Sequence, residues 1–67
     1  MTCTILDVIN GGSLWLLVVD TGGRIVDQPV EPRQMADIVV GEGLSHPAEL
    51  RWREIELADD GLTVAFV

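Results

Sequence analysis

The longest run of apolar residues in the chain covers positions 14–19, six residues that Asp20 closes. A strand with one face in water alternates apolar and polar residues, and this run does not alternate. Six residues are also too few to span a membrane, which takes about 20. The pattern therefore predicts the central strand of a small sheet, paired at both edges and covered on both faces.

The segments on either side of this run predict two further strands. Residues 2–9 are rich in β-branched side chains, which favour a strand. The Asn-Gly pair at the start of 10–13 tolerates positive φ and favours a hairpin turn. A second glycine turn at 21–23 leads to a strand over 24–28, which Pro29 ends because it lacks a ladder donor. Three strands joined by tight turns form an antiparallel meander with the apolar run in the middle.

A short helix follows the meander. Pro32 can occupy the first helical position, where its missing N–H costs nothing. Within 33–40, the side chains of Met35, Ile38 and Val39 recur at i, i+3 and i+4 and form one apolar stripe. Two glycines directly after this segment end the helix. A helix of about two turns is too short to persist alone, so we expect it to pack on the sheet.

The last third of the chain allows two interpretations. Residues 48–57 have a helix-like composition, but their apolar side chains form no single stripe on a helical wheel. As a strand the segment alternates, with one slip of phase that a bulge near Arg53 and Glu54 would correct. We therefore predict a strand here. Residues 59–61 then form a turn, and the alternating segment 62–67 completes a carboxy-terminal hairpin.

This order of elements predicts an α+β fold, with a small antiparallel sheet made of a three-strand meander, one short helix and a carboxy-terminal hairpin. Residues 1–67 form a single small domain whose core is marginal for its length. If the hairpin folds over the meander, the sheet curls into a partial barrel. If the hairpin extends the sheet, an apolar face that includes some of Leu16, Val18, Val64 and Phe66 stays open. A second copy would then cover that face, so we expect a homodimer.

The charges are strongly unbalanced. Eleven acidic side chains stand against four arginines, giving a net charge of −7. This balance disfavours phosphate backbones and anionic membranes, so we expect no direct nucleic-acid partner, no membrane partner and a basic charge on any charged protein partner. The amino-terminal segment lacks the basic and apolar regions of a signal peptide. With its single cysteine, the chain fits a reducing compartment, and we predict a cytoplasmic location.

Few side chains have the pattern that catalysis requires. The single histidine, His46, lies in a predicted loop, and the single cysteine, Cys3, lies in a predicted strand. A catalytic pair would also need an acid and an oxyanion site to converge on them. Glu54 and Glu56 share a strand face about 7 Å apart, but a glycosidase pair needs a sugar-sized cleft as well. We therefore predict a protein that is not an enzyme, with no catalytic residue, cofactor or metal.

The segment from Arg51 to Arg53 has the composition of an interface, because Trp and Arg are enriched at binding hot spots. Together with the following acids it gives the candidate interface residues Arg51, Trp52, Arg53, Glu54 and Glu56. The alternative places Trp52 in the core and pairs both arginines with acids such as Glu54 and Glu56.

Our first hypothesis is a non-catalytic protein–protein interaction module that forms a homodimer. The alternative hypothesis is a small acidic inhibitor or nucleic-acid mimic, of the type found in phages and mobile elements, that occupies a basic groove on a partner protein. That alternative rests on size and charge alone, by analogy.

Overall fold

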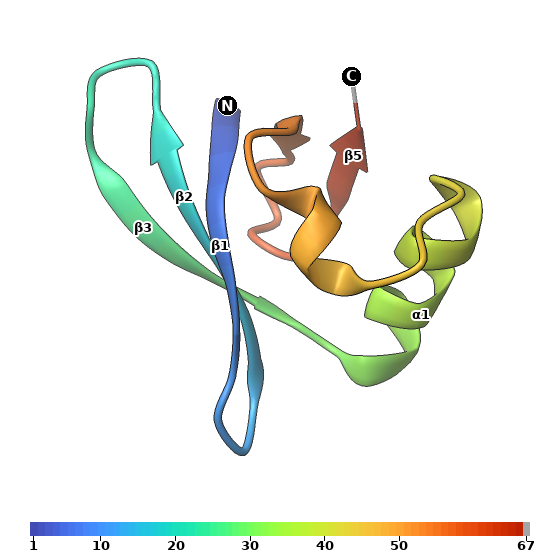
Figure 1. Ribbon diagram of the computed structural model, residues 1–67. Coiled ribbons are helices and arrows are strands. Elements are labelled where there is room, and N and C mark those ends of the chain that lie inside the picture. Colours follow the sequence, from blue (N-terminus) through green and yellow to red (C-terminus); the bar gives the residue numbers. More distant parts are fainter. Residues whose placement is uncertain (67) are drawn as a thin grey trace.

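Residues 1–66, the part of the chain that the computed structural model describes, form one antiparallel sheet with a short α-helix (Figure 1). The elements in chain order are β1 (Thr2–Asn10), β2 (Leu14–Asp20), β3 (Ile25–Val30), α1 (Pro32–Gly41), the 3₁₀ helix η1 (Pro47–Leu50), β4 (Glu54–Leu57) and β5 (Val64–Phe66). The strands lie in the order β3-β2-β1-β4-β5. The predicted α+β class and the antiparallel sheet are confirmed.

The apolar run lies in the interior of the sheet, as expected. β2 pairs with β1 along one edge and with β3 along the other. The middle strand of the sheet is nevertheless β1, because β1 also pairs with β4 through residues 2–4. That pairing joins segments about fifty positions apart in the sequence, and no local sequence pattern predicts it.

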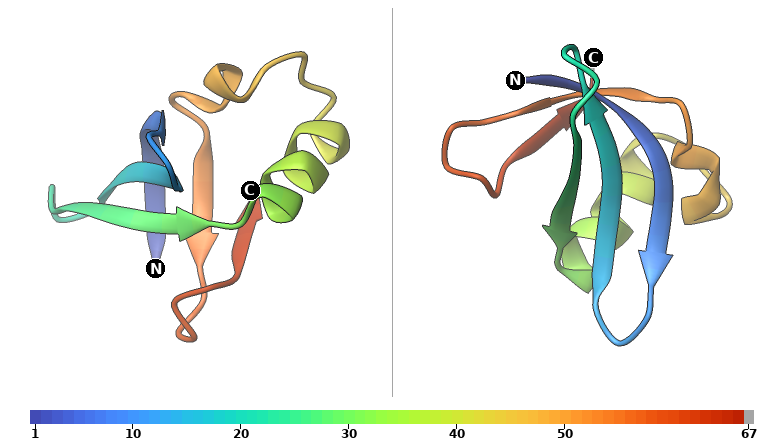
Figure 2. Two further views of the ribbon diagram at one scale, coloured as in Figure 1. Left: turned by 90° about the horizontal axis from the view of Figure 1, so that it is seen from below. Right: turned by 90° about the vertical axis from the view of Figure 1, so that its left-hand side faces the viewer.

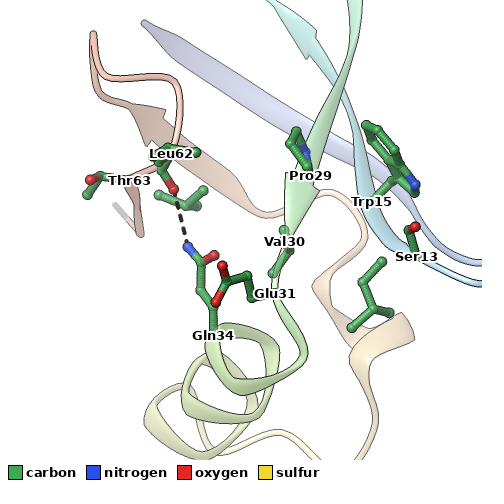
Figure 3. Close-up of a pocket in the computed structure, with 10 residues that line it drawn as sticks. Ser13, Trp15, Pro29, Val30, Glu31, Gln34, Leu62 and Thr63 are labelled. Carbon is green, nitrogen blue, oxygen red and sulfur yellow. Dashed lines mark hydrogen bonds between the residues drawn. The ribbon is translucent and has the colours of Figure 1, made fainter.

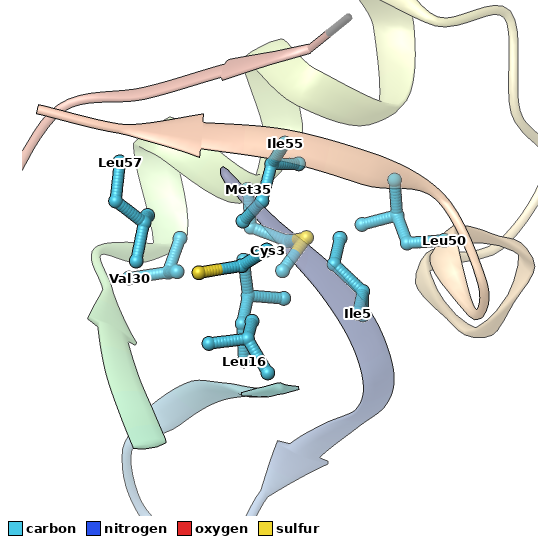
Figure 4. Close-up of a cluster of buried hydrophobic side chains, with 9 residues drawn as sticks. Cys3, Ile5, Leu16, Val30, Met35, Leu50, Ile55 and Leu57 are labelled. Atoms are coloured by element: carbon cyan, nitrogen blue, oxygen red, sulfur yellow. The ribbon is translucent and has the colours of Figure 1, made fainter. Parts of the chain in front are cut away.

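The core fills one side of the sheet, which we call the inner face. From β1, β2 and β4 it receives Ile5, Leu16, Val18 and Ile55, each with 0% exposure. Helix α1 adds Met35 to this core, and the predicted stripe is confirmed because Ile38 and Val39 pack against it. Figure 4 shows the core side chains gathered between β1, β2 and β4. Burying one such side chain contributes about 1.5–3 kcal/mol, and this burial fixes the inner face.

The boundaries of two predicted strands, 24–28 and 48–57, are wrong. Strand β3 does not stop before Pro29 but continues through it to Val30, in register with β2. A proline fits there because β3 is an edge strand, where a missing N–H need not remove a ladder bond.

The predicted strand over 48–57 is also wrong in its first part, which forms η1. Pro47 begins this 3₁₀ turn and the imidazole Nδ1 of His46 accepts the N–H of Ala48 at 3.0 Å, which caps it.

The bulge expected near Arg53 and Glu54 lies elsewhere. β4 is a regular strand over Glu54–Leu57, and the register shifts in β1 instead, between Ile5 and Asp7. The extra residue in β1 restores the alternation that an uninterrupted strand would lose.

The sheet is open at both ends. No pairing joins β3 to β5 within residues 1–66, so the partial barrel is not confirmed. The β4–β5 loop is held to β3 by a side chain, because the Gln28 amide donates to the carbonyl of Gly61 at 2.8 Å.

Strand β5 is shorter than the predicted 62–67, and Val67 lies outside the described residues. In residues 1–66, no helix is both long and apolar enough to cross a membrane.

Candidate protein-interaction surface

The side of the sheet opposite the core, which we call the outer face, carries three rows of side chains on β1, β2 and β3. Strand register defines the rows as Ile9–Trp15–Pro29, Asp7–Leu17–Asp27 and Thr4–Val19–Ile25. Figure 2, in its right-hand view, looks onto these three strands with α1 and η1 behind them. All the helical cover in residues 1–66 thus lies on the inner side.

Apolar side chains on the outer face remain accessible to solvent. Ile25 is 62% exposed, Ile9 is 43% exposed and Trp15 is 38% exposed. Leu17 and Val19 are half-buried, without packing against the core. Residues 1–66 thus cover only one of the two faces of the apolar run, and the expected cover of the other face is not supplied by this part of the chain.

The open apolar face is also not the one expected. Leu16 and Val18, named as candidates for exposure, have 0% exposure, and Val64 and Phe66 pack against the core. Successive side chains of a strand point to opposite faces, so the residues of β2 that remain accessible are the alternate set.

The β1 bulge places an ion pair at the border of the outer face. Because the register shifts after Ile5, Asp7 lies opposite Leu17. Asp7 Oδ1 accepts the backbone N–H of Val8 at 2.8 Å and Nε–H of Arg51 at 3.0 Å, and Arg51 Nη2 lies 2.9 Å from the same oxygen. These contacts, the Val8 N–H first, lower the pKa of Asp7 and keep it ionised at neutral pH.

Trp52, the centre of the predicted interface segment, is 71% exposed, so the alternative that placed it in the core is wrong. Its φ is 70°, in the left-handed region that is sterically unfavourable for a bulky residue. The backbone is held by two hydrogen bonds, from Trp52 N–H to the Ile5 carbonyl at 2.7 Å and from Arg53 N–H to the Leu50 carbonyl at 3.1 Å. An indole held in solvent on a strained backbone has the features expected of a contact residue.

The other predicted interface residues have partners of their own. Arg53 forms an ion pair with Glu42, and its guanidinium carbon lies 5.7 Å from the centre of the Phe66 ring. Neither arginine pairs with Glu54 or Glu56, contrary to the alternative assignment.

Both glutamates extend the outer face onto β4, since Glu54 lies opposite Thr4 and Glu56 opposite Thr2. Hydrogen bonds from the amino terminus and from the Thr2 hydroxyl, in that order, lower the pKa of Glu56. The structure therefore brings Arg51 and the two glutamates to the outer face or its border, while Arg53 faces the inner side with Phe66.

A groove of about 560 Å³ lies between the end of β3, the start of α1 and the β4–β5 loop. Its walls include Trp15, Val30 and Leu62, with Glu31 and Gln34 at the helix side. Figure 3 shows the Gln34 amide reaching toward the carbonyl of Leu62, with a distance of 3.4 Å. Sequence reasoning did not identify this groove, because β3 and the loop come together only in the fold.

The two residues considered for nucleophilic chemistry have separate structural roles. Cys3 is buried in the core at 2% exposure, and burial raises the pKa of its thiol. His46 is exposed and caps η1. Within residues 1–66 no cluster of histidine, cysteine, aspartate or glutamate has the arrangement of a metal site.

Comparisons of the chain with protein-family models, with curated proteins and with solved structures find no match. The residues that sequence reasoning missed are Ile9, Trp15 and Ile25. The sequence did contain a signal for them. Each is an apolar residue next to a residue that faces the core, and an apolar residue at the alternate position of a strand lies on the opposite face.

Proposed function

We propose that the chain is a non-catalytic protein–protein interaction module that binds its partner with the outer face of β1, β2 and β3. The observation that carries this proposal is the exposure of Ile9, Trp15 and Ile25 on one face, around the half-buried Leu17 and Val19. Contiguous apolar surface of this kind on a small domain marks interaction sites, especially where polar residues surround it. Asp27 and Glu54 supply that polar border.

The acidic inhibitor, or nucleic-acid mimic, has weaker support. Such a protein needs its carboxylates on one face, at spacings like those of phosphates. Four of the acids lie on the outer face, namely Asp7, Asp27, Glu54 and Glu56. Two of these are engaged, Asp7 with Arg51 and Glu56 with the amino terminus. The remaining acids are distributed over the end of β2, the two helices, turns and loops.

Capture from cells of the native host tests the proposed function. The tagged chain is compared with Leu17→Lys, which places a charge at the centre of the outer face. The matched control is Val40→Lys, because Val40 is 80% exposed on α1 and away from this face. We expect at least one protein, or the untagged chain itself, to be captured by the native chain and the control and lost with Leu17→Lys. Equal capture by both variants would refute the outer face as the binding surface.

A further inference from the structure

The charges on the outer face are arranged asymmetrically about β2. In the row Asp7–Leu17–Asp27, Asp7 on the β1 side is paired with Arg51. Asp27 on the β3 side has no ion-pair partner within residues 1–66. Within this row, the face therefore carries an ion pair that includes a base on one side of β2 and an unpaired acid on the other.

We infer that the occupant of this face is a second copy of the chain, packed face to face with the twofold axis parallel to β2. This inference rests on the proposed function and names its partner. Rotation by 180° about such an axis places β2 over β2 of the second copy and β1 over its β3. Sheets in sandwiches pack in this aligned manner, about 10 Å apart and within about 30° of each other.

The apolar rows match under this rotation. Trp15, Leu17 and Val19 each face the same residue of the second copy along the axis, which gives the interface a continuous apolar centre. Beside the axis, Ile9 faces Pro29 of the second copy, and Ile25, the most exposed of these residues, faces Thr4 of the second copy. The side chains that lack cover in one chain thus cover each other.

The charges decide the direction of the axis. With the axis parallel to β2, Asp27 faces the Asp7–Arg51 pair of the second copy. Arg51 binds Asp7 through Nε and Nη2, so other N–H groups of its guanidinium can donate to the second carboxylate. With the axis in the plane of the interface but perpendicular to the strands, Asp27 would face Asp27, and each Asp7–Arg51 pair would face the same pair of the second copy. That arrangement juxtaposes the two unpaired Asp27 carboxylates and is disfavoured.

Sedimentation equilibrium of the purified chain tests the occupant. We expect a dimer for the native chain and for Val40→Lys, and a monomer for Leu17→Lys, in which two ammonium groups would meet at the axis. Ile25→Lys, at a position 62% exposed, provides a second disruptive variant if Leu17→Lys does not fold. A native chain that is monomeric at high micromolar concentration, or a dimer that survives these changes in folded variants, would overturn the inference.

The direction of the twofold axis is tested by whether removing the Asp27 charge weakens or strengthens the dimer. Asp27→Asn should raise the dimer dissociation constant about two- to thirtyfold, because the twofold axis repeats the solvent-accessible ion pair and the substitution removes both copies of it. Asp37→Asn is the matched control, because it changes the net charge equally at an exposed position of α1. If Asp27→Asn strengthened the dimer relative to this control, the axis would be perpendicular to the strands.

The two proposals fail in different ways. In one outcome, the chain is monomeric and still captures a different protein, with capture lost in Leu17→Lys but not in Val40→Lys. That result overturns the proposed dimer and retains the proposed interaction module. A monomeric chain with no capture that depends on the outer face overturns both.

Discussion

Replacing Trp52 by glycine should stabilise the folded chain, although it removes a large aromatic side chain. At φ 70° a bulky residue is strained by roughly 1–2 kcal/mol, whereas glycine adopts this conformation freely. The indole is 71% exposed, so its removal sacrifices little burial. Glycine also adds freedom to the unfolded chain, which costs about 0.5–1 kcal/mol. The net expectation is a gain of about 0.5–1 kcal/mol in the free energy of unfolding.

Urea denaturation followed by circular dichroism measures this gain. The variants are made on Leu17→Lys, because association would otherwise add a concentration-dependent contribution to stability. Trp52→Ala is the matched control, since it removes the indole but keeps a Cβ and therefore the strain. Trp52→Gly should exceed both the parent and the alanine variant in stability. If glycine were less stable than alanine, the backbone at this position would not be under strain.

Three further outcomes are expected on the same background. Ile55→Ala, at a position with 0% exposure, should lower the free energy of unfolding by about 2–5 kcal/mol, whereas Ile25→Ala on the outer face should change it by at most about 0.5 kcal/mol. Hydrogen exchange should be slower for the β2 amides than for residues 21–23, and equal rates would contradict an interior β2. The pKa of Asp60 is lowered to about 2, first by the Thr63 hydroxyl, so this carboxylate contributes stability above its ordinary pKa of 3.8 that is lost as the pH falls toward 2. Urea denaturation at acid pH should show that the free energy of unfolding falls less steeply with decreasing pH in Asp60→Asn than in the parent.

Local patterns in the sequence predicted the elements whose causes are local. The unbroken apolar run at 14–19 placed β2 between two neighbours, and Pro32 with the stripe beginning at Met35 placed α1. At these positions the backbone preference and the apolar pattern favour the same structure. The strand predicted for residues 48–50 is wrong because the two signals disagree there: Pro47 and the His46 cap favour a 3₁₀ turn, whereas the alternation of the whole segment favours a strand.

Features that depend on distant segments could not be predicted. The pairing of β1 with β4 makes β1 the middle strand, and it is specified by no short motif. The partner of Arg51 is Asp7, which lies 44 positions away and faces outward because of the β1 bulge. The exposure of Trp52 follows from its left-handed backbone, and an aromatic residue gives no signal of such a conformation in the sequence.

The apolar run at 14–19 has two separate consequences, because successive residues of a strand face opposite ways. Leu16 and Val18 build the core, and the chain itself supplies their cover from α1 and β4. Trp15, Leu17 and Val19 receive no comparable cover, since the helical elements of residues 1–66 all lie on the inner side. The fold does not require them to be apolar, because polar β-branched residues would suit the same backbone. Six apolar residues in succession therefore indicate an interior strand, and the three that face outward are the ones that the proposed second copy would cover.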